Sequence, residues 1–375
     1  FLASGSHVVS LDASGGCTRW VHPVDGRLVR AVSLATLPVP GAPGRAVLVF
    51  GDDSSTVTAL DAGTGEVLWR TRVEEHVLSR ITAAPSIHDG RVFAPSSGIE
   101  DPLTHDPAHE CCTSRGGVAA LDLATGKLLW KQYHIVEEPT LRTGANEMPR
   151  RFGPAGASTY TPLAIDAKRG VLYASTAEEY GLLDPRGPYS VIAYDLESGA
   201  RKWQRQFLPD ASARELACAA AAPTDCRNLF STGTSVTIVT LAGGKQVLTV
   251  GQKWGFVYGL DPDSNGEELW RTRVALGGDL GGVMYGMATD GSALYVPVSD
   301  DEASPPHRPG GLAALDPASG AVLWRVAGPD PQCSWGAQGC NAAFVAAPTA
   351  VPGAVFTGAW DGRVRKRGRS SPHPG

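Results

Sequence analysis

Short alternations of apolar and polar residues recur along the chain, and each closes on a tryptophan. Every copy has an apolar–Asp or Tyr–Asp pair, a glycine-containing turn and a second short segment that ends at the tryptophan. This order predicts a strand, a tight turn and a second strand. The six copies are LDASGGCTRW, LDAGTGEVLW, LDLATGKLLW, YDLESGARKW, LDPDSNGEELW and LDPASGAVLW, and they end at Trp20, Trp69, Trp130, Trp203, Trp270 and Trp324.

The spacing of the copies predicts a repeat fold with insertions. Successive tryptophans are separated by 49 to 73 residues, so a constant unit alternates with inserted segments of different length. Further strand patterns lie upstream of the repeat, at residues 91–95, 171–175 and 293–297. We therefore predict an all-β fold, a β-propeller of four-stranded blades. The six tryptophans should pack between neighbouring blades, with Asp61 and Gly65 as structural turn residues.

Composition agrees with this fold and excludes two classes of partner. The 375 residues include 45 Gly and 28 Pro, which suit short strands and turns. With 33 Lys and Arg against 38 Asp and Glu, the formal net charge is -5, so no basic surface for nucleic acid is expected. No apolar run approaches the roughly 20 residues that cross a bilayer, and we predict no membrane span.

Both ends of the chain depart from the repeat. The N-terminus begins at Phe1 in what reads as the middle of a strand, and the apolar pattern stops after Gly362. We expect a propeller domain over residues 1–362, truncated at both ends, and a disordered or non-native tail over residues 363–375.

The repeat resembles the tryptophan-docking repeat of the pyrroloquinoline quinone (PQQ) dehydrogenases over essentially the whole chain. Within that family the polyvinyl alcohol dehydrogenase type is the most similar, through CCTSRGGVAALD at 111–122, TLAGGKQVLTVGQKWGFVYGLD at 240–261 and CSWGAQGC at 333–340. The resemblance implies an eight-bladed propeller with PQQ near its axis and calcium beside it. A seventh unit begins at residues 354–358 and stops, and no CxxCH haem motif occurs.

The adjacent Cys111 and Cys112 are the sharpest chemical signal. A disulfide between neighbouring residues closes a strained ring that is rare outside sites that use it. The resemblance implies that this ring stacks on the planar quinone, whereas two reduced loop thiols are the alternative. Cys17 is expected to be a small buried hydrophobe. Two further pairs are spaced for small disulfide loops, which indicates a periplasmic or secreted protein: Cys218 with Cys226, and Cys333 with Cys340.

The resemblance implies three more cofactor-binding residues. Tyr160 lies where the family has a tryptophan beneath the cofactor, and a tyrosine offers a smaller stacking surface. Arg115 and Lys253 match basic positions that contact PQQ oxygens, as a ligand with three carboxylates requires. Either residue could instead be an ordinary charged residue of the protein surface.

The resemblance also implies calcium ligands. Glu100, in the segment SSGIED, matches a calcium-ligating glutamate of the family, and Glu178 follows a turn of small residues where the family has a second ligand. Calcium prefers carboxylate and carbonyl oxygens. Either glutamate could instead be a solvated loop carboxylate.

The general base is the weakest assignment. Relatives carry an aspartate before the GGKQ-type strand, but here the aligned residues are Leu229 to Ser231, and Asp225 is only a weak candidate. We predict a PQQ- and calcium-dependent dehydrogenase that oxidises secondary alcohols, polymeric ones included, and passes electrons to a separate cytochrome c. The alternatives are a cofactor-free propeller that acts as a protein scaffold, and a degenerate homologue that binds PQQ without turnover.

Overall fold

The computed structural model describes residues 1–25, 27–39, 42–106, 108–144, 149–180, 187–208, 230–278, 280–300, 309–333 and 340–368. Its described elements are β-strands and one short 3-10 helix, η1 (Asp101–His105). The chain divides into a first unit, Phe1–Pro188 with Ala193–Arg201, and a second unit, Tyr189–Ile192 with Lys202–Gly375. The division falls within the sheet of β15 to β18.

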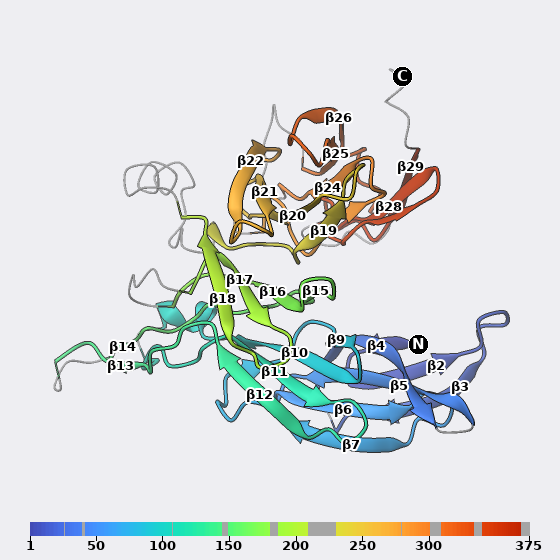
Figure 1. Cartoon of the computed structure of the whole chain (residues 1–375), viewed down its shortest axis with the longest axis vertical. Helices are drawn as coiled ribbons and strands as arrows, with labels where there is room; N and C mark the ends of the chain where they lie inside the picture. The colour runs from blue at the N-terminus through green and yellow to red at the C-terminus, as the bar shows by residue number, and fades with distance from the viewer. Residues whose placement is uncertain are drawn as a thin grey trace. The chain divides into compact units, whose positions relative to one another are not determined.

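The early strands form antiparallel sheets in chain order (Figure 1). The first sheet comprises β1 (Leu2–Ser4), β2 (His7–Leu11) and β3 (Thr18–Pro23). The second comprises β4 (Val29–Val39), β5 (Ala42–Asp52), β6 (Thr56–Asp61) and β7 (Val67–Arg72). The third comprises β8 (Ser79–Arg80), β9 (Ser86–His88), β10 (Arg91–Gly98), β11 (Gly117–Asp122) and β12 (Leu128–Tyr133). A separate pair follows, β13 (Thr140–Leu141) and β14 (Phe152–Gly153).

The later strands repeat the same pattern. The fourth sheet comprises β15 (Ala164–Asp166), β16 (Val171–Ser175), β17 (Ser190–Asp195) and β18 (Arg201–Gln206). The fifth comprises β19 (Thr237–Thr240), β20 (Gln246–Gly251), β21 (Phe256–Asp261) and β22 (Glu267–Arg273). The sixth comprises β23 (Ala288–Thr289), β24 (Leu294–Val298), β25 (Gly311–Leu315) and β26 (Val322–Ala327). The last comprises β27 (Thr349–Val351), β28 (Ala354–Gly358) and β29 (Val364–Gly368).

The repeat turn forms as its residues predict. Asp61 accepts hydrogen bonds from the amides of Gly63 at 2.8 Å and Thr64 at 2.9 Å, and Gly65 has φ +78°, where a side chain would be strained. Asp122 and Gly126 repeat the same arrangement. The turn residues are therefore structural, as expected.

Five of the six repeat tryptophans, Trp20, Trp69, Trp130, Trp203 and Trp270, pack on the turn glycine of the next repeat. A Cβ on Gly65 would lie 2.8 Å from the Trp20 ring, and Trp20 Nε1 donates to the Ala62 carbonyl at 3.1 Å. Trp69 packs in the same way on Gly126. In the second unit Trp203 packs on Gly266, and Trp270 on Gly320. The prediction that these tryptophans lie between neighbouring blades is confirmed for these pairs.

The core lies between the sheets of successive repeats. Val49 and Val57 of the second sheet share one buried cluster with Val92 and Leu121 of the third, and the two sheets lie side by side in Figure 1. In the second unit, Val257 and Leu294 belong to an equivalent cluster. Such burial contributes about 25 cal/mol for each Å² of apolar surface, so the contact between blades stabilises each unit.

The cysteines divide into three groups. Disulfides join Cys111 to Cys112 and Cys333 to Cys340, as predicted. Cys17 is free and exposed, so the expectation that it is buried was wrong: it lies in the turn before β3, outside the sheet contact. The third predicted pair, Cys218 with Cys226, lies outside the described residues.

The last sheet extends past the domain boundary expected at residue 362. β29 pairs with β28 from Val364 to Gly368, and residues 369–375 lie outside the described part of the chain. Among the described residues there is no helix with the length and apolar character to span a bilayer.

Candidate functional site

The Cys111–Cys112 disulfide lies in the first unit, on the segment that leads into β11. Both cysteines are fully buried, and they pack with Ala155 and Tyr180. The Cys111 carbonyl accepts the Phe152 amide at 2.6 Å, which ties the ring to β14. The peptide bond between the cysteines is cis. The sequence prediction of a vicinal disulfide is thus met, and the alternative of two reduced loop thiols is not.

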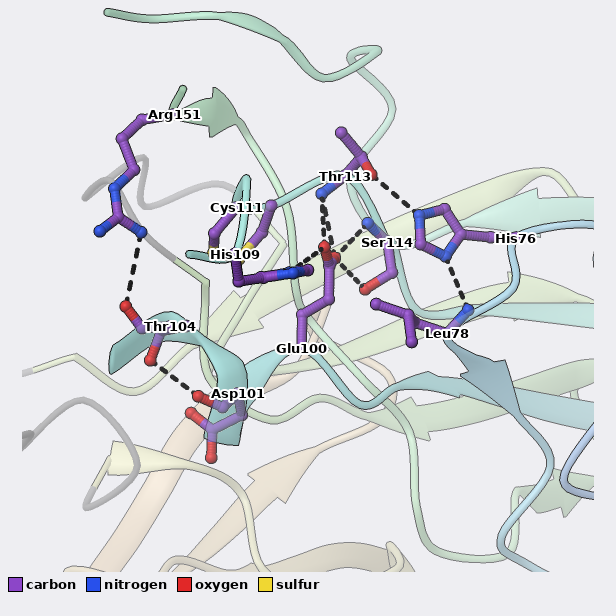
Figure 2. A network of polar contacts seen from close by, with 11 residues as sticks. His76, Leu78, Glu100, Asp101, Thr104, His109, Cys111, Thr113, Ser114 and Arg151 are labelled. Carbon is purple, nitrogen blue, oxygen red and sulfur yellow. Dashed lines mark hydrogen bonds and ion pairs between the residues drawn. A yellow bond between two sulfur atoms is a disulfide. The ribbon is translucent and has the colours of Figure 1, made fainter. Parts of the chain in front are cut away.

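Glu100 lies at the centre of a polar network beside the disulfide (Figure 2). Its Oε2 accepts hydrogen bonds from the Thr113 amide at 3.0 Å, the Ser114 amide at 2.6 Å and the Ser114 hydroxyl at 2.5 Å. The Glu100 side chain is 1% exposed. This carboxylate therefore holds the two residues that follow the disulfide, and it is not a solvated loop carboxylate.

The other oxygen of Glu100 has longer contacts. Oε1 lies 3.3 Å from the Thr113 amide and 3.3 Å from His109 Nε2. His109 also brings a ring nitrogen within 4.8 Å of both cysteine sulfurs. These sulfurs are bonded to each other and are not thiolates, which are the form that binds metals.

His76 supports the same segment from the opposite side (Figure 2). Its Nδ1 accepts the Leu78 amide at 3.2 Å, and its Nε2 lies 2.8 Å from the Thr113 hydroxyl. Since Nδ1 accepts, Nε2 carries the proton in the neutral ring and donates to Thr113. Thr113 is therefore held through its amide by Glu100 and through its side chain by His76.

Glu178 and Tyr180 approach the site from the segment after β16. Glu178 is buried, so the alternative of a solvated carboxylate does not apply to it either. The Tyr180 hydroxyl donates to the Gly98 carbonyl at 3.1 Å and lies 2.8 Å from Ser158 Oγ. Burial above all, and then the negative charge of Glu178, raise the pKa of Tyr180 well above its usual value. Smaller contributions come from Asp101 and Glu100, so three carboxylates act on one phenol.

The described residues do not assemble a calcium shell by themselves. Calcium takes six to eight oxygen ligands, and the nearest partners of Glu100 are N–H and O–H donors instead of acceptor oxygens. In the described ranges, the one cluster of three or more Asp, Glu, His or Cys in ligand range is His109, Cys111 and Cys112, which contains neither Glu100 nor Glu178. The printed contacts of Glu100 alone therefore do not make up a calcium shell.

Arg115 is committed to a neighbouring loop. Its Nη1 donates to the carbonyls of Val136 at 3.2 Å and Glu137 at 3.0 Å, and its Nη2 pairs with Glu138 at 2.8 Å. The guanidinium also stacks over the Tyr133 ring, 4.0 Å from its centroid. Arg115 is 8% exposed, so it is not an ordinary surface charge.

Tyr160 is half-buried and follows Thr159, which contacts two of the site segments. The Thr159 amide donates to the Ser96 carbonyl at 3.3 Å, and its hydroxyl donates to the Ser175 carbonyl at 2.8 Å. The structure thus joins the segments of Glu100, Tyr160 and Glu178, which lie far apart in the sequence. The resemblance offered no signal for His76, His109 or Tyr180, whose roles follow from contacts across loops.

Lys253 lies in the second unit, where it is buried. Its amide donates to the Ser231 carbonyl at 3.0 Å, and the neighbouring Gln252 donates to the Phe230 carbonyl at 2.5 Å. Burial is at odds with an ordinary surface lysine. Asp225, the candidate base, lies outside the described residues.

Most of the chain matches a known protein family. The family model PQQ_2, described as outer membrane protein assembly factor BamB, matches residues 3–207 and 253–366. The chain belongs to the PQQ-type β-propeller family. The all-β propeller of four-stranded blades predicted from the repeat is thereby confirmed.

Similar proteins place this PQQ-type chain beside alcohol dehydrogenases. It is 37% identical over 369 residues to a polyvinylalcohol dehydrogenase of Pseudomonas sp, covering 97% of this chain and 57% of that protein. It is 35% identical over 370 residues to a polyvinylalcohol dehydrogenase of Sphingopyxis sp. (strain 113P3), covering 96% of this chain and 56% of that protein. The chain spans little more than half the length of these two relatives.

A solved structure supports the fold. The crystal structure of the quinohemoprotein alcohol dehydrogenase of Comamonas testosteroni superposes with a TM-score of 0.67 at 17% identity. The match covers 99% of this chain and 64% of that chain. At this identity the likeness establishes the propeller and leaves the chemistry to the residues of the site.

Proposed function

We propose that this chain is the propeller of a PQQ-dependent dehydrogenase that oxidises secondary alcohols, polymeric ones included, and passes the electrons to a separate cytochrome c. The support is the similarity to two proteins named polyvinylalcohol dehydrogenase across nearly the whole chain. We further propose a periplasmic or secreted location, because disulfides persist in oxidising compartments.

The buried Cys111–Cys112 disulfide carries this proposal. A closed ring of two cysteines offers a flat, polarizable surface, which suits a planar quinone, and both residues are fully buried. Glu100 holds the following residues, Thr113 and Ser114, through a short charged hydrogen-bond network. A scaffold protein has no evident need for such a ring fixed by a buried carboxylate.

The other residues have supporting parts in the proposal. PQQ, when bound, supplies a two-electron acceptor for hydride removed from the alcohol. Tyr160 would stack on the cofactor, and Lys253 and Arg115 would contact its oxygens, with Arg115 also held by the Glu138 loop. Asp225 stays the candidate general base. Calcium enters as an ion to be tested, with Glu100 and Glu178 as the candidate ligands.

A cofactor-free scaffold is the second candidate function. The matching family model is described as an outer membrane assembly factor, which supports a role in binding proteins. The contacts that Arg115 makes with the Glu138 loop also agree with a structural role for that residue.

Calorimetric titration of PQQ into the purified chain, with and without calcium, separates the two candidates. The variant Cys111→Ser/Cys112→Ser tests the ring, and Cys333→Ser/Cys340→Ser is the matched control, because it removes a disulfide elsewhere. A dye-linked assay with a secondary alcohol then tests turnover.

Binding of one PQQ per chain that is lost in the first variant and kept in the control supports the dehydrogenase. Binding without turnover would indicate a PQQ-binding homologue that does not catalyse. No binding by the parent chain, with or without calcium, would overturn the proposal and favour the scaffold.

A further inference from the structure

A fully buried histidine lies behind the candidate site. His134 follows β12 in the first unit and is 0% exposed. Its Nδ1 lies 2.8 Å from the Tyr194 hydroxyl, and its Nε2 lies 2.9 Å from the Thr159 hydroxyl. Both ring nitrogens therefore have hydrogen-bond partners, as a buried imidazole requires.

The direction of these hydrogen bonds follows from their last acceptor. The Thr159 hydroxyl has one proton and donates it to the Ser175 carbonyl at 2.8 Å, and a carbonyl can only accept. Thr159 Oγ1 must then accept from His134 Nε2, so in the neutral ring His134 Nδ1 accepts from Tyr194. The neutral imidazole thus carries its proton on Nε2.

The surroundings keep this arrangement in one protonation state. Burial, and then the charge of Arg201, lower the pKa of His134 to about 3. Burial raises the pKa of Tyr194 to about 12. Arg201 Nη2 also donates to the His134 carbonyl at 2.6 Å, so the backbone of His134 is fixed as well as its ring.

Thr159 is where three site segments meet. Its amide donates to the Ser96 carbonyl at 3.3 Å, and its carbonyl accepts the Ser97 hydroxyl at 2.8 Å, at the start of the segment that carries Glu100. Its hydroxyl reaches Ser175, at the start of the segment that carries Glu178. Tyr160 is the next residue in the chain. A change at Thr159 is therefore transmitted to each of these segments.

We propose that His134 is a positioning residue that sets the mutual placement of the segments carrying Glu100, Tyr160 and Glu178. Its donated proton fixes the Thr159 hydroxyl, which would otherwise be free to turn from Ser175 to another acceptor. Loss of the imidazole would remove the donor to the Thr159 hydroxyl and leave the Tyr194 O–H without its printed acceptor. The use of this arrangement in cofactor binding rests on the proposed function.

Amide hydrogen exchange of the cofactor-free chain tests the positioning role directly. In His134→Phe we expect exchange to be about tenfold faster in peptides covering residues 96–101, 157–161 and 173–178, with β5 and β6 unchanged. His134→Gln keeps a donor and an acceptor and should recover part of the protection. Val92→Ala is the matched control, because it weakens a buried contact of β10 without touching the network.

Two results of this experiment would overturn the proposal. One is unchanged exchange in the three segments of His134→Phe. The other is an equal increase in β5 and β6, or the same pattern in Val92→Ala, either of which would indicate general destabilisation.

Nitrogen-15 spectra of the parent should show the neutral Nε2–H tautomer of His134 from pH 8 to pH 5. A His134 ring that titrates near pH 6.5 would also contradict the proposal.

A second measurement separates this inference from the proposed function. If the parent chain binds PQQ, His134→Phe should bind it at least about tenfold more weakly, while Val92→Ala binds as the parent does. Equal affinity in His134→Phe would overturn the positioning role. If the parent binds no PQQ, the proposed function fails, and the exchange pattern still decides whether His134 positions the three segments.

Discussion

The crevice between adjacent blades is built differently in the two units, although the repeat places equivalent residues around it. In the first unit a cavity of about 430 Å³ is lined by Glu74, Glu75, His76, Thr113, Arg115, Tyr133, Glu138 and Pro139. In the second unit the corresponding cavity is about 540 Å³. Its lining includes Arg273, Val274, Ala275, Leu276, Val298, Asp300, Leu312 and Ala327. Charged and polar side chains predominate in the first lining, whereas the second has Arg273, Asp300 and Arg325 among residues that are otherwise aliphatic or glycine.

Two equivalent backbone amides in the two units have their hydrogen-bond acceptors on different segments. Five residues after the repeat tryptophan, Glu74 accepts the amides of Glu75 at 2.8 Å and His76 at 3.1 Å. The equivalent position in the second unit is Ala275, whose side chain has no acceptor. There Asp300, from the segment after β24, accepts the amides of Leu276 at 2.8 Å and Gly277 at 3.0 Å.

This difference decides what else the crevice can hold. The second oxygen of Glu74 pairs with Lys131 at 2.6 Å, and Lys131 also donates to Tyr133 at 2.9 Å, so an ion pair and an aromatic side chain lie beside the first crevice. The residue equivalent to Tyr133, three positions after the repeat tryptophan, is Ala327 in the second unit. A shared backbone requirement is thus met by a local carboxylate in one unit and by a distant one in the other.

The largest expected effect is in the second unit. Asp300→Ala would leave the amides of Leu276, Gly277 and Gly282 without their acceptor, and alanine is strained at the φ of +43° found there. We expect the free energy of unfolding to fall by about 3 kcal/mol, measured by urea denaturation. Asp300→Asn tolerates this φ and keeps one acceptor oxygen, so it should lose less. If Asp300→Ala has the same free energy of unfolding as the parent, Asp300 does not replace Glu74 as the acceptor that stabilises these amides.

The next effect is an acid sensitivity of the first unit. The unfolded His134 takes up a proton below about pH 6.5, but the folded residue, with a pKa of about 3, does not. Its contribution to stability is therefore complete above pH 6.5 and falls as the pH drops toward 3. Between pH 6.5 and pH 5 this residue should cost the parent about 1.6 kcal/mol. In His134→Gln the free energy of unfolding should fall less steeply with decreasing pH over this range. If urea denaturation shows the same pH dependence for the variant and the parent, His134 is not the source of the acid sensitivity.

A smaller effect is expected at Glu74. Burial alone would raise the pKa of Glu74, but hydrogen bonds from Lys131, the His76 amide and Tyr133, with the Lys131 charge, hold that pKa below its usual value of 4.5. The stabilisation is thus present above about pH 4.5 and is lost as the pH falls through the lowered value. Glu74→Gln should cost about 1.5 kcal/mol at pH 7, and the gap to the parent should close toward pH 3.

The matched control for Glu74 is its neighbour Glu75, whose side chain is 81% exposed. Glu75→Gln should change the free energy of unfolding by less than about 0.5 kcal/mol at either pH. If the difference in free energy of unfolding between Glu74→Gln and the parent does not change with pH, the lost stability does not come from the ion pair with Lys131.

The smallest effect should come from filling the open crevice. Ala327→Tyr places in the second unit the ring that Tyr133 supplies in the first, and Ala327 lines a cavity large enough for it. We expect a change in the free energy of unfolding within about 0.5 kcal/mol, measured by urea denaturation. A loss above about 1.5 kcal/mol would show that the second crevice does not admit an aromatic side chain.

Some of the candidate site could be predicted from local sequence. The vicinal disulfide needs only that Cys111 and Cys112 be adjacent, and the segment around Glu100 could be found because its motif is contiguous. Arg115 was predicted as a cofactor contact, yet its partners are carbonyls of the loop after β12, more than 20 residues away. Such partners depend on how an inserted loop folds back, and no local pattern encodes that.

The sequence by itself determined the repeat: the strand alternation, the Asp and Gly of each turn, and a tryptophan that must find an apolar contact in the next repeat. These features act within a few residues or recur at every unit, so they can be read without coordinates. Only the tertiary structure decided that His134 supports Thr159, that Glu100 holds Thr113 and Ser114, and that Asp300 replaces Glu74. Each of these contacts satisfies a buried polar group from a distant segment, and the partner exists only once the blades have packed.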